Sequence, residues 1–457
     1  MADYDLVIVG AGSGNMLPND ELTGLSIAVV ESDRFGGTCL NRGCIPSKML
    51  VYAADVARLT RDAGRFGIKA TFGGADWPAI RERVFGRIDP LHERAIAYRR
   101  RLGAHVYLGD ARFTAPKVLD VGGDVVTGDQ FVVAVGSRPR VPEIPGLDSV
   151  AFHTSDTIMR IEQLPASLVV IGGGPLAAEM SHIFGALGSR VTIVHRGDVL
   201  LAEHDEEVRQ RFTDECARYY DVRLRTNVER VAPSSVGVAL EITTDGKQER
   251  IEAEMLLVGA GRVPNSDLLD VAAAGIAVDE DGHVVTDATG ATNVAGVWAI
   301  GDTANHFQLK NVANREARVV RHNVLHPGEP IAMDTRFVPS AIFAYPQVAT
   351  VGETEQELRA RGAAYLVGRR DFSDTGYGWA MEDTTGFAKV LVDPQHRRLL
   401  GAHIIGPQAS ILIQSLVQAM CLGDTVDQLA HDVLYAHPAL TEVVEQALLA
   451  IDGHKGV

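Results

Sequence analysis

The same three-part pattern occurs twice in this chain: a short apolar run, a glycine-rich turn and a second apolar run. The first copy comprises residues 6–9, the turn at 10–15 and residues 27–31. The second comprises residues 168–171, 172–177 and 190–194. Such runs are typical of strands buried on both faces of a parallel sheet, and a glycine-rich turn between two of them is typical of a nucleotide-binding Rossmann unit. The sequence therefore predicts an α/β protein with two nucleotide-binding units.

The first copy has the spacing of a dinucleotide site. Glu31 lies 21 residues after Gly10, close to the spacing expected of a carboxylate that binds a ribose. The glycines would let the backbone approach a pyrophosphate, and the following helix N-terminus would bind it. Two features weaken the match, because Asn15 replaces the third glycine and Pro18 makes the next segment a poor helix. A glycine-rich turn without a ligand stays open as an alternative.

The second copy ends in His195-Arg196 rather than in an acid. A carboxylate at this point would bind the ribose 2′-hydroxyl, whereas an arginine accommodates a 2′-phosphate. The sequence therefore favours NADPH over NADH, with an ordinary surface arginine as the alternative.

Two cysteines follow the first copy closely. Cys39 and Cys44 are five residues apart, and in a regular helix their Cα atoms would be about 8.7 Å apart. A disulfide needs less than about 7 Å, so the chain must leave helical geometry, with Gly43 supplying the freedom. Pro46 fits the first turn of a helix, which places Cys44 at a helix N-terminus that favours a thiolate. We expect a redox-active pair.

A structural disulfide and half of a metal site are the alternatives for this pair. A metal would need two more ligands, and Cys216 and Cys421 are isolated in the sequence. No metal is therefore expected.

Composition excludes several partner classes. The net charge of −16 argues against nucleic acid and anionic membranes as partners, and no apolar run approaches the roughly 20 residues of a transmembrane helix. The acidic N-terminus does not resemble a signal peptide, and four cysteines are too few for a secreted disulfide scaffold. We expect a cytoplasmic protein.

Further motifs complete the pattern. Residues 297–300 predict a strand that ends at Gly301-Asp302, and a carboxylate at a strand's C-terminal end commonly faces a ligand in an open α/β sheet; a helix N-cap is the alternative for Asp302. Near the C-terminus, His437 precedes Pro438 and lies five residues before Glu442. Residues 409–420 predict an amphipathic helix.

Together these segments make the chain similar, over its whole length, to the class I pyridine nucleotide–disulfide oxidoreductases, the family of glutathione reductase, dihydrolipoamide dehydrogenase and mercuric reductase. Residues 12–15, 48–54, 309–314 and 338–341 make it most similar, within the family, to the mycothione reductases. Arg42 between the cysteines, Pro175 where an aromatic often gates the nicotinamide pocket, and Val135 where Thr is usual depart from the expected pattern. The motifs are the two glycine turns, the cysteine segment, residues 134–146, 261–265 and 301–302, and His437-Pro438.

The resemblance implies an FAD domain of residues 1–150 and 264–335, an inserted NADPH domain of residues 151–263, and an α+β interface domain of residues 336–457 that forms a homodimer. The FAD contacts that it implies are Gly10, Gly12, Ser13, Gly14, Glu31, Gly37, Thr38, Lys48, Gly136, Gly301 and Asp302. The NADPH contacts are Gly172, Gly174, Leu176, Ala177, Glu179, His195, Arg196, Gly261 and Arg262.

The resemblance also implies roles. Cys39 would attack a small-molecule disulfide, Cys44 would lie nearest the flavin, and Lys48 would pair with Glu179 beside it. His437, oriented by Glu442, would act across the dimer on the partner's site. The expected reaction is NADPH-dependent reduction of mycothione. Dihydrolipoamide dehydrogenase activity, reduction of another small disulfide, and a flavin-bound redox sensor without catalytic turnover are the alternatives.

Overall fold

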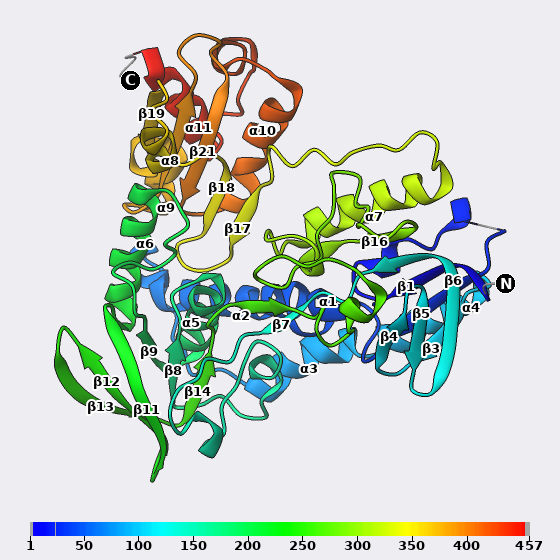
Figure 1. Cartoon of the computed structure of the whole chain (residues 1–457). Helices are drawn as coiled ribbons and strands as arrows, with labels where there is room; N and C mark the ends of the chain where they lie inside the picture. The colour runs from blue at the N-terminus through cyan, green and yellow to red at the C-terminus, as the bar shows by residue number, and fades with distance from the viewer. Residues whose placement is uncertain (1–2, 23, 453–457) are drawn as a thin grey trace.

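The computed structural model of the chain describes residues 3–22 and 24–452. Two sheets with parallel strands at their centres occupy the first two thirds of the chain, and an antiparallel sheet lies near the C-terminus (Figure 1). The predicted α/β class, with two Rossmann-like units and a C-terminal α+β part, is confirmed. None of the helices in the described ranges combines the length and apolarity that a membrane crossing requires.

The first sheet is built around the first glycine turn. Its central strand β1 (Tyr4–Val9) pairs in parallel with β2 (Ile27–Glu31) and with β6 (Asp124–Val133). Leu6, Val7 and Ile8 are fully buried, which explains the unbroken apolar run, since both faces of the sheet are covered. The strands that complete the sheet are β3 (His105–Leu108), β4 (Ala111–Ala115), β5 (Val118–Val121) and β16 (Val297–Ala299).

The described residues between β1 and β2 form no α-helix, so the expectation that a helix N-terminus follows the first glycine turn is wrong. Two 3-10 turns, Gly14–Met16 and Asp20–Leu22, take its place, because Pro18 cannot continue a helix. Buried Arg99 supplies the hydrogen bonds that a helix would make internally. It donates to the Asn15 side-chain oxygen and to the Pro18 carbonyl, both at 2.7 Å.

The connection between β2 and β3 is helical and includes the cysteines. Its first helix ends one residue before Gly43, and the second begins one residue after it. The long second helix packs against the helix of the second nucleotide unit at the middle of the molecule (Figure 1). The four helices are α1 (Gly37–Arg42), α2 (Cys44–Asp62), α3 (Trp77–Ile88) and α4 (Leu91–Arg101).

The second sheet repeats the arrangement with a full helix. After β8 (Ser167–Ile171) the glycine turn leads into α5 (Pro175–Leu187), with Pro175 in its first turn, where a missing N–H costs nothing. The sheet is parallel throughout, in the order β10-β9-β8-β14. The other elements of this part are β9 (Arg190–Val194), α6 (Glu206–Tyr219), β10 (Asp221–Arg223), β14 (Met255–Val258) and the antiparallel β11 (Thr226–Ser234), β12 (Gly237–Thr244) and β13 (Lys247–Ala253).

A short antiparallel ladder stands where the chain passes between the two units. It pairs β7 (Ser137–Pro139) with β15 (Arg262–Pro264), so the segment that leaves the first sheet lies beside the segment that returns from the second. After β16, α7 (Lys310–Leu325) packs back toward the first glycine turn.

The C-terminal part is a five-stranded antiparallel sheet in the order β17-β18-β21-β20-β19. The predicted helix at 409–420 is present as α10, whose buried face includes Leu412, Ile413 and Leu416. The elements are β17 (Ser340–Ile342), β18 (Val348–Gly352), α8 (Glu355–Ala360), β19 (Leu366–Asp371), α9 (Gly376–Met381), β20 (Phe387–Val392), β21 (Leu399–Ile405), α10 (Ala409–Leu422) and α11 (Glu442–Leu449).

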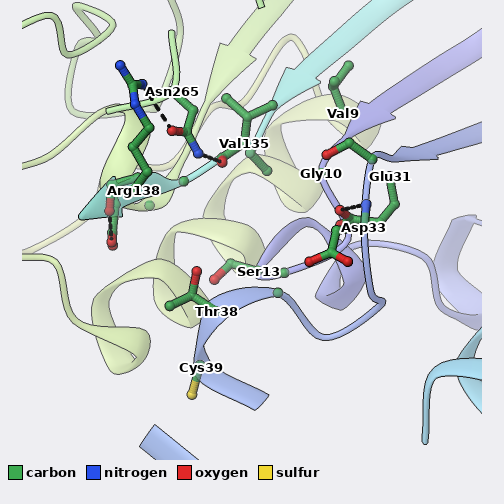
Figure 2. A pocket seen from close by; sticks show the side chains of 18 of the residues that line it. Val9, Gly10, Ser13, Glu31, Asp33, Thr38, Cys39, Val135, Arg138 and Asn265 are labelled. Carbon is green, nitrogen blue, oxygen red and sulfur yellow. Dashed lines mark hydrogen bonds between the residues drawn. The ribbon is translucent and has the colours of Figure 1, made fainter. Parts of the chain in front are cut away.

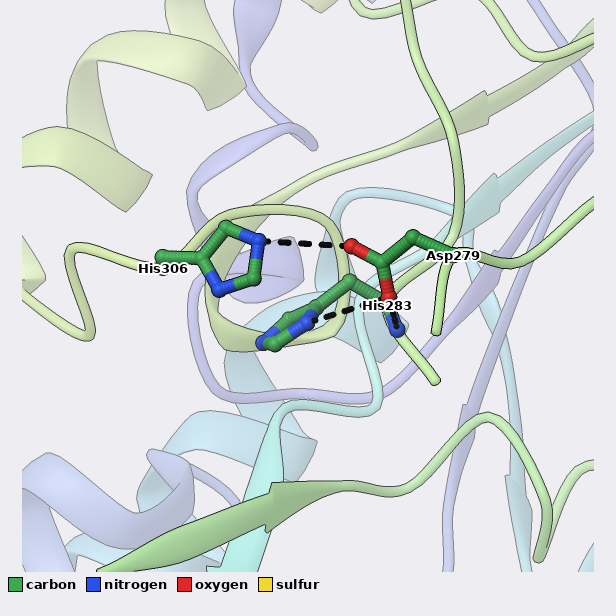
Figure 3. Close-up of side chains that lie close together, drawn as sticks. All are labelled: Asp279, His283 and His306. Carbon is green, nitrogen blue, oxygen red and sulfur yellow. Dashed lines mark hydrogen bonds and ion pairs between the residues drawn. The ribbon is translucent and has the colours of Figure 1, made fainter. Parts of the chain in front are cut away.

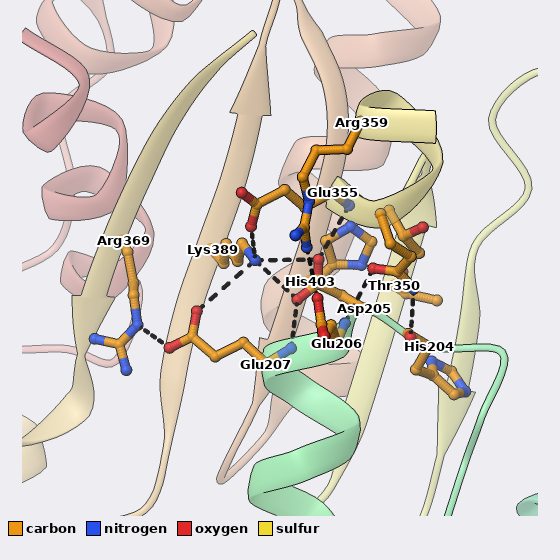
Figure 4. A network of polar contacts seen from close by, with 12 residues as sticks. His204, Asp205, Glu206, Glu207, Thr350, Glu355, Arg359, Arg369, Lys389 and His403 are labelled. Atoms are coloured by element: carbon orange, nitrogen blue, oxygen red, sulfur yellow. Dashed lines mark hydrogen bonds and ion pairs between the residues drawn. The ribbon is translucent and has the colours of Figure 1, made fainter. Parts of the chain in front are cut away.

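A buried ion network joins this sheet to α6 (Figure 4). The Lys389 side chain, 3% exposed, donates to both carboxylate oxygens of Asp205, at 2.9 and 3.1 Å, and pairs with Glu355. Asp205 is also the N-cap of α6. Breaking one partner of a buried ion pair leaves an uncompensated charge and typically costs several kcal/mol, so this contact fixes how the second nucleotide unit sits against the C-terminal sheet.

Candidate active site

The two cysteines lie on either side of a break between α1 and α2. Gly43 has φ −139° and ψ −118°, and a Cβ there would lie 2.9 Å from the Thr38 carbonyl oxygen and 3.3 Å from the Cys39 Cα. Only glycine fits without displacing the backbone. Cys44 is the first residue of α2, as predicted, and its thiol therefore lies at the positive end of a helix dipole.

The local environment gives the two thiols different pKa values. Both are free and lie within hydrogen-bonding reach of each other. The hydrogen bond from Cys39 lowers the pKa of Cys44 to about 7, helped by the charge of Lys48 and opposed by burial. The same hydrogen bond and burial raise the pKa of Cys39. The pair therefore holds one proton on Cys39 and a thiolate on Cys44 near neutral pH.

Lys48 and Glu179 form an ion pair across two helices. Lys48 lies one turn after Cys44 on α2, and its Nζ is 2.7 and 2.8 Å from the Glu179 carboxylate oxygens. Glu179 lies on α5 and is 8% exposed. It also accepts a hydrogen bond of 3.0 Å from the Phe343 backbone N–H. This carboxylate thus joins both nucleotide units and the start of the C-terminal sheet beside the cysteines.

A cavity of about 590 Å³ opens beside the cysteines at the carboxyl ends of β1, β2 and β6 (Figure 2). It is lined by nine of the eleven residues predicted to contact FAD; Gly14 and Lys48 are outside the lining. Cys39 and Cys44 line it as well. The nine are Gly10, Gly12, Ser13, Glu31, Gly37, Thr38, Gly136, Gly301 and Asp302.

At two backbone positions that line this cavity, only glycine fits. Gly10 has φ +103°, and a Cβ on it would lie 2.3 Å from the Ala134 carbonyl oxygen. A Cβ on Gly37, φ +59°, would lie 2.6 Å from the Gly12 Cα. Backbone that is bare on this side lets a pyrophosphate approach closely, so the residues present fit the dinucleotide that the sequence predicts.

Two of the carboxylates that line the cavity are held in place by hydrogen bonds. Glu31 accepts a 2.7 Å hydrogen bond from the Ala11 backbone N–H, and burial raises the pKa of Glu31. Asp302 accepts a hydrogen bond from the Ser137 hydroxyl at 2.7 Å. Arg262, predicted to contact the second nucleotide, instead donates to Ser137 and lies 3.8 Å from Asp302 in the first cavity.

Lys310 and Arg42 are two of the five basic residues that line this cavity and were not among the predicted contacts. Lys310 opens α7 and places its Nζ 3.1 Å from the Ser13 hydroxyl; burial lowers its pKa. Arg42, the residue between the cysteines, pairs with Asp33 and with Asp156, so its charge is neutralised at the cavity wall. Only the position of Lys310 shortly after Gly301-Asp302 could have indicated it from the sequence.

The backbone of the second glycine turn is as closely packed as that of the first. A Cβ on Gly172, φ +136°, would lie 2.3 Å from the Gly259 carbonyl oxygen, and one on Gly173 would lie 2.6 Å from the His195 ring. The turn brings together Gly172, Gly174, Leu176 and Ala177 at the start of α5, and His195 and Arg196 just after β9. Arg196 is exposed and forms no hydrogen bond or ion pair within residues 3–22 and 24–452, so its guanidinium is free to meet a ligand.

His437 and Glu442 form a pair in the C-terminal part. His437 Nδ1 lies 2.7 Å from a Glu442 carboxylate oxygen, and the other oxygen accepts a hydrogen bond from the Ala439 N–H at 3.1 Å. The hydrogen bond to His437 lowers the pKa of Glu442. The His437 side chain is 79% exposed, and α11, which Glu442 opens, lies well apart from α1 (Figure 1).

Comparison with known proteins covers nearly the whole chain. The family model described as pyridine nucleotide-disulphide oxidoreductase matches residues 4–317, and that of its dimerisation domain matches residues 338–448.

Among curated proteins, mycothione reductase of Mycobacterium tuberculosis is 45% identical over 99% of this chain and 100% of its own length. A dihydrolipoyl dehydrogenase of Chlamydia trachomatis is 32% identical over 98% of this chain and 97% of its own. Among solved structures, a Cu(II) complex of the HOCl-induced flavoprotein disulfide reductase RclA of Escherichia coli superposes with a TM-score of 0.86 and 26% identity, covering 99% of this chain and 100% of its own.

Proposed function

The chain belongs to the pyridine nucleotide-disulphide oxidoreductase family, and from that premise we propose that it is an FAD-containing, NADPH-dependent reductase of mycothione. The observation that carries the reaction class is the cysteine pair: two thiols at a helix break, one with its pKa lowered to about 7, facing a cavity that fits a dinucleotide. The 45% identity to a mycothione reductase supports the substrate.

FAD bound in the first cavity would carry two electrons from the pyridine nucleotide to a Cys39–Cys44 disulfide. Gly10, Gly12 and Gly37 would hold its pyrophosphate, with Glu31 at the ribose. Asp302 and Lys310 line the same cavity and would contact the rest of the molecule. Lys48, paired with Glu179, would place a positive charge beside Cys44 and keep that sulfur ionised when the disulfide opens.

A single base, His437, is enough for the thiol–disulfide exchange. The opened pair carries one proton, on Cys39, and a thiolate on Cys44. His437 of the partner subunit removes the Cys39 proton, the Cys39 sulfur attacks one sulfur of the substrate, and the substrate S–S bond breaks. The departing thiolate takes that proton back from His437. Cys44 then attacks the Cys39 sulfur, the Cys39–Cys44 bond re-forms, and the second thiolate leaves with a proton from solvent.

We assign His437 to the partner's site because it is exposed and separated from its own cysteines, and because Glu442 already holds its Nδ1, which leaves Nε2 to face a substrate. The proposal therefore includes a homodimer through the matched dimerisation domain. The domain division at 150, 263 and 335 and the cytoplasmic location stay predictions.

A panel of disulfides assayed with NADPH tests the substrate. Mycothione carries uncharged, hydroxyl-rich sugar and inositol rings, and a site built to hydrogen-bond hydroxyls leaves polar groups unpaired when they are missing. We expect kcat/KM for mycothione to exceed that for glutathione disulfide by roughly 10³ or more. Comparable values for the two would move the assignment elsewhere in the family.

Two alternatives are separated by the same panel. Dihydrolipoamide dehydrogenase activity, raised by the 32% identity to such enzymes, predicts faster turnover of lipoamide than of mycothione, with NAD preferred. A redox sensor that only signals to a protein partner predicts a single stoichiometric reduction of Cys39–Cys44 and no sustained NADPH consumption with any small disulfide.

A further inference from the structure

Three side chains that can bind a metal converge outside the active site (Figure 3). Asp279 and His283 lie on one tight turn, and His306 lies on the loop that follows Gly301-Asp302. One ligand atom from each residue lies within 4.8 Å of the other two. None of the three belongs to the cavity or to the cysteine site described above, and the sequence alone indicated no metal.

The distances suit a small tetrahedral ion. His283 Nδ1 lies 3.5 Å from one Asp279 oxygen, and His306 Nε2 lies 3.3 Å from the other. An ion bound at about 2.0–2.1 Å separates its tetrahedral ligands by roughly 3.3–3.4 Å. The His306 side chain is 66% exposed, so it can rotate to close the third edge, and the same exposure gives an ion a path from solvent.

His283 provides the independent observation. Its side chain is 7% exposed, and neither ring nitrogen has a hydrogen-bond partner among the described residues. A buried polar side chain is nearly always paired, and an unpaired one points to a water or ion that belongs there. The ring faces His306 at a centroid distance of 4.0 Å, so its nitrogens lie beside the other ligands.

The backbone holds Asp279 in position. One of its oxygens accepts hydrogen bonds from the backbone N–H groups of Asp281 and His283, at 3.0 and 2.8 Å. The turn is closed by a bridge between Val278 and Val284. The arrangement therefore fixes the carboxylate before any ligand arrives and leaves its second oxygen directed at His306.

We propose that Asp279, His283 and His306 bind a divalent transition-metal ion, with Zn²⁺ the preferred ion and water as the remaining ligand. Two imidazole nitrogens and one carboxylate suit Zn²⁺, whereas Mg²⁺ and Ca²⁺ prefer all-oxygen sites. The ion clamps the Asp279–His283 turn to the loop that carries His306. The Val284 N–H already donates to the Thr303 carbonyl at 2.8 Å, so the clamp steadies the segment next to Asp302 in the FAD cavity.

Calorimetric titration of ZnCl₂ into the oxidised holoenzyme tests the site, because the Cys39–Cys44 disulfide then cannot bind the metal through its thiols. We expect His306→Ala and His283→Ala each to weaken the site roughly 100-fold or more, since loss of an outer-shell partner alone costs 10–100-fold. His396→Ala is the matched control: this exposed histidine pairs with Asp393 at 2.6 Å and, among the residues that the structure describes, belongs to no group of three potential metal ligands. It should bind Zn²⁺ like the wild type.

The variants also distinguish Zn²⁺ binding at this site from Zn²⁺ binding to other side chains on the surface. His306 is exposed, so His306→Ala should fold even if His283→Ala does not. Zn²⁺ should raise the Tm of the wild-type holoenzyme and of His396→Ala but not that of His306→Ala, and Mg²⁺ should raise none of them. The proposal is overturned if His306→Ala retains the wild-type affinity, or if the site disappears instead in His431→Ala, from the exposed Asp427–His431–Asp452 group.

Discussion

At the scale of single residues, the acidity of Cys44 depends first on a hydrogen bond that one substitution can keep and another can remove. Cys39→Ser retains a donor, whereas Cys39→Ala removes the largest cause that lowers the Cys44 pKa. Thiolate is the reactive form, so alkylation of Cys44 should rise with pH through about 7 in the reduced wild type. We expect the same inflection in Cys39→Ser and a higher one in Cys39→Ala.

Alkylation rates with iodoacetamide, located by mass spectrometry over a pH series, measure this shift. A rise of one pKa unit would lower the rate at pH 7 roughly five-fold, because the thiolate fraction would fall from about one half to about one eleventh. Buried Cys216 should be unreactive in every variant and serves as the internal reference, since burial raises its pKa. An inflection that stays near 7 in Cys39→Ala would show that Lys48 and the helix N-terminus suffice without Cys39.

Arg196 should distinguish NADPH from NADH. It is exposed just after β9, where a second nucleotide's 2′-phosphate is expected, and it has no hydrogen-bond or ion-pair partner in the described ranges. Arg196→Ala should raise the KM for NADPH by roughly 10–150-fold, the worth of a charge-assisted contact of about 1.5–3 kcal/mol. The KM for NADH should barely change in the same steady-state assays.

Arg190→Ala is the matched control, because Arg190 is exposed at the opposite end of the same strand. It should leave both constants near their wild-type values. Equal losses for NADPH and NADH in Arg196→Ala would mean that this side chain does not read the 2′-phosphate.

At the scale of elements, the break between α1 and α2 is the feature on which the cysteine geometry depends. Gly43→Ala would bring a Cβ within 2.9 Å of the Thr38 carbonyl oxygen, and an overpacked contact of this kind typically costs about 1–3 kcal/mol. We expect a lower Tm and a Cys39–Cys44 pair that is harder to oxidise. Thermal denaturation and redox titration with glutathione buffers measure the two effects.

Gly64→Ala controls for loss of a glycine. A Cβ on Gly64 meets nothing within 4 Å, so stability and thiol chemistry should stay as in the wild type. If Gly43→Ala behaved like Gly64→Ala, the helix break would not be what sets the distance between the sulfurs.

The sequence predicted those helices and strands that are determined by neighbouring residues in the chain. The strand 190–194 and the helix at 409–420 follow from apolar periodicity, and both are present as β9 and α10. The break at Gly43 followed from the separation of the cysteines alone. The absence of a helix after the first glycine turn was only hinted at by Pro18, because its replacement depends on Arg99, more than 80 residues away.

Site residues that depend on long-range contacts could not be predicted in this way. Lys310 reaches Ser13 across 297 residues of sequence, and no periodicity indicates which lysine does so. Arg262 belongs to a motif beside the second unit, yet the β7–β15 ladder brings it to Ser137 in the first cavity. The roles of the predicted contacts stay predictions, although most of them lie together around two glycine turns.

At the scale of the whole molecule, three parts must keep their relative positions for one site to work. Glu179 links α2, α5 and the residue after β17 through Lys48 and the Phe343 N–H. Lys389 and Asp205 link the second unit to the C-terminal sheet from the other side (Figure 4). Both links are carboxylate–ammonium contacts between distant segments, and nothing in the local sequence around Lys389 marks it as buried.

The remaining requirement is a second copy of the chain. If His437 serves the partner's cysteines, His437→Ala and Cys39→Ser should each be nearly inactive as homodimers. In a heterodimer of the two variants, the cysteines of the His437→Ala subunit face an intact histidine, so one of two sites is complete. Random reassembly of equal amounts makes half of the dimers mixed, and a two-fold symmetric interface then predicts activity of about a quarter of wild type.

This recovery can be measured directly with separately tagged subunits that are dissociated, mixed and purified through both tags. The purified heterodimer should reach about half of the wild-type kcat, because one of its two symmetric sites works. His396→Ala mixed with Cys39→Ser controls for subunit exchange. His396 lies in the same C-terminal part but pairs with Asp393, so that variant keeps its own activity and the mixture gains nothing from complementation. Verified heterodimers of His437→Ala and Cys39→Ser that stay inactive would place His437 in its own subunit's site. That outcome would require the C-terminal part to move, because α11 and α1 lie well apart in the folded chain (Figure 1).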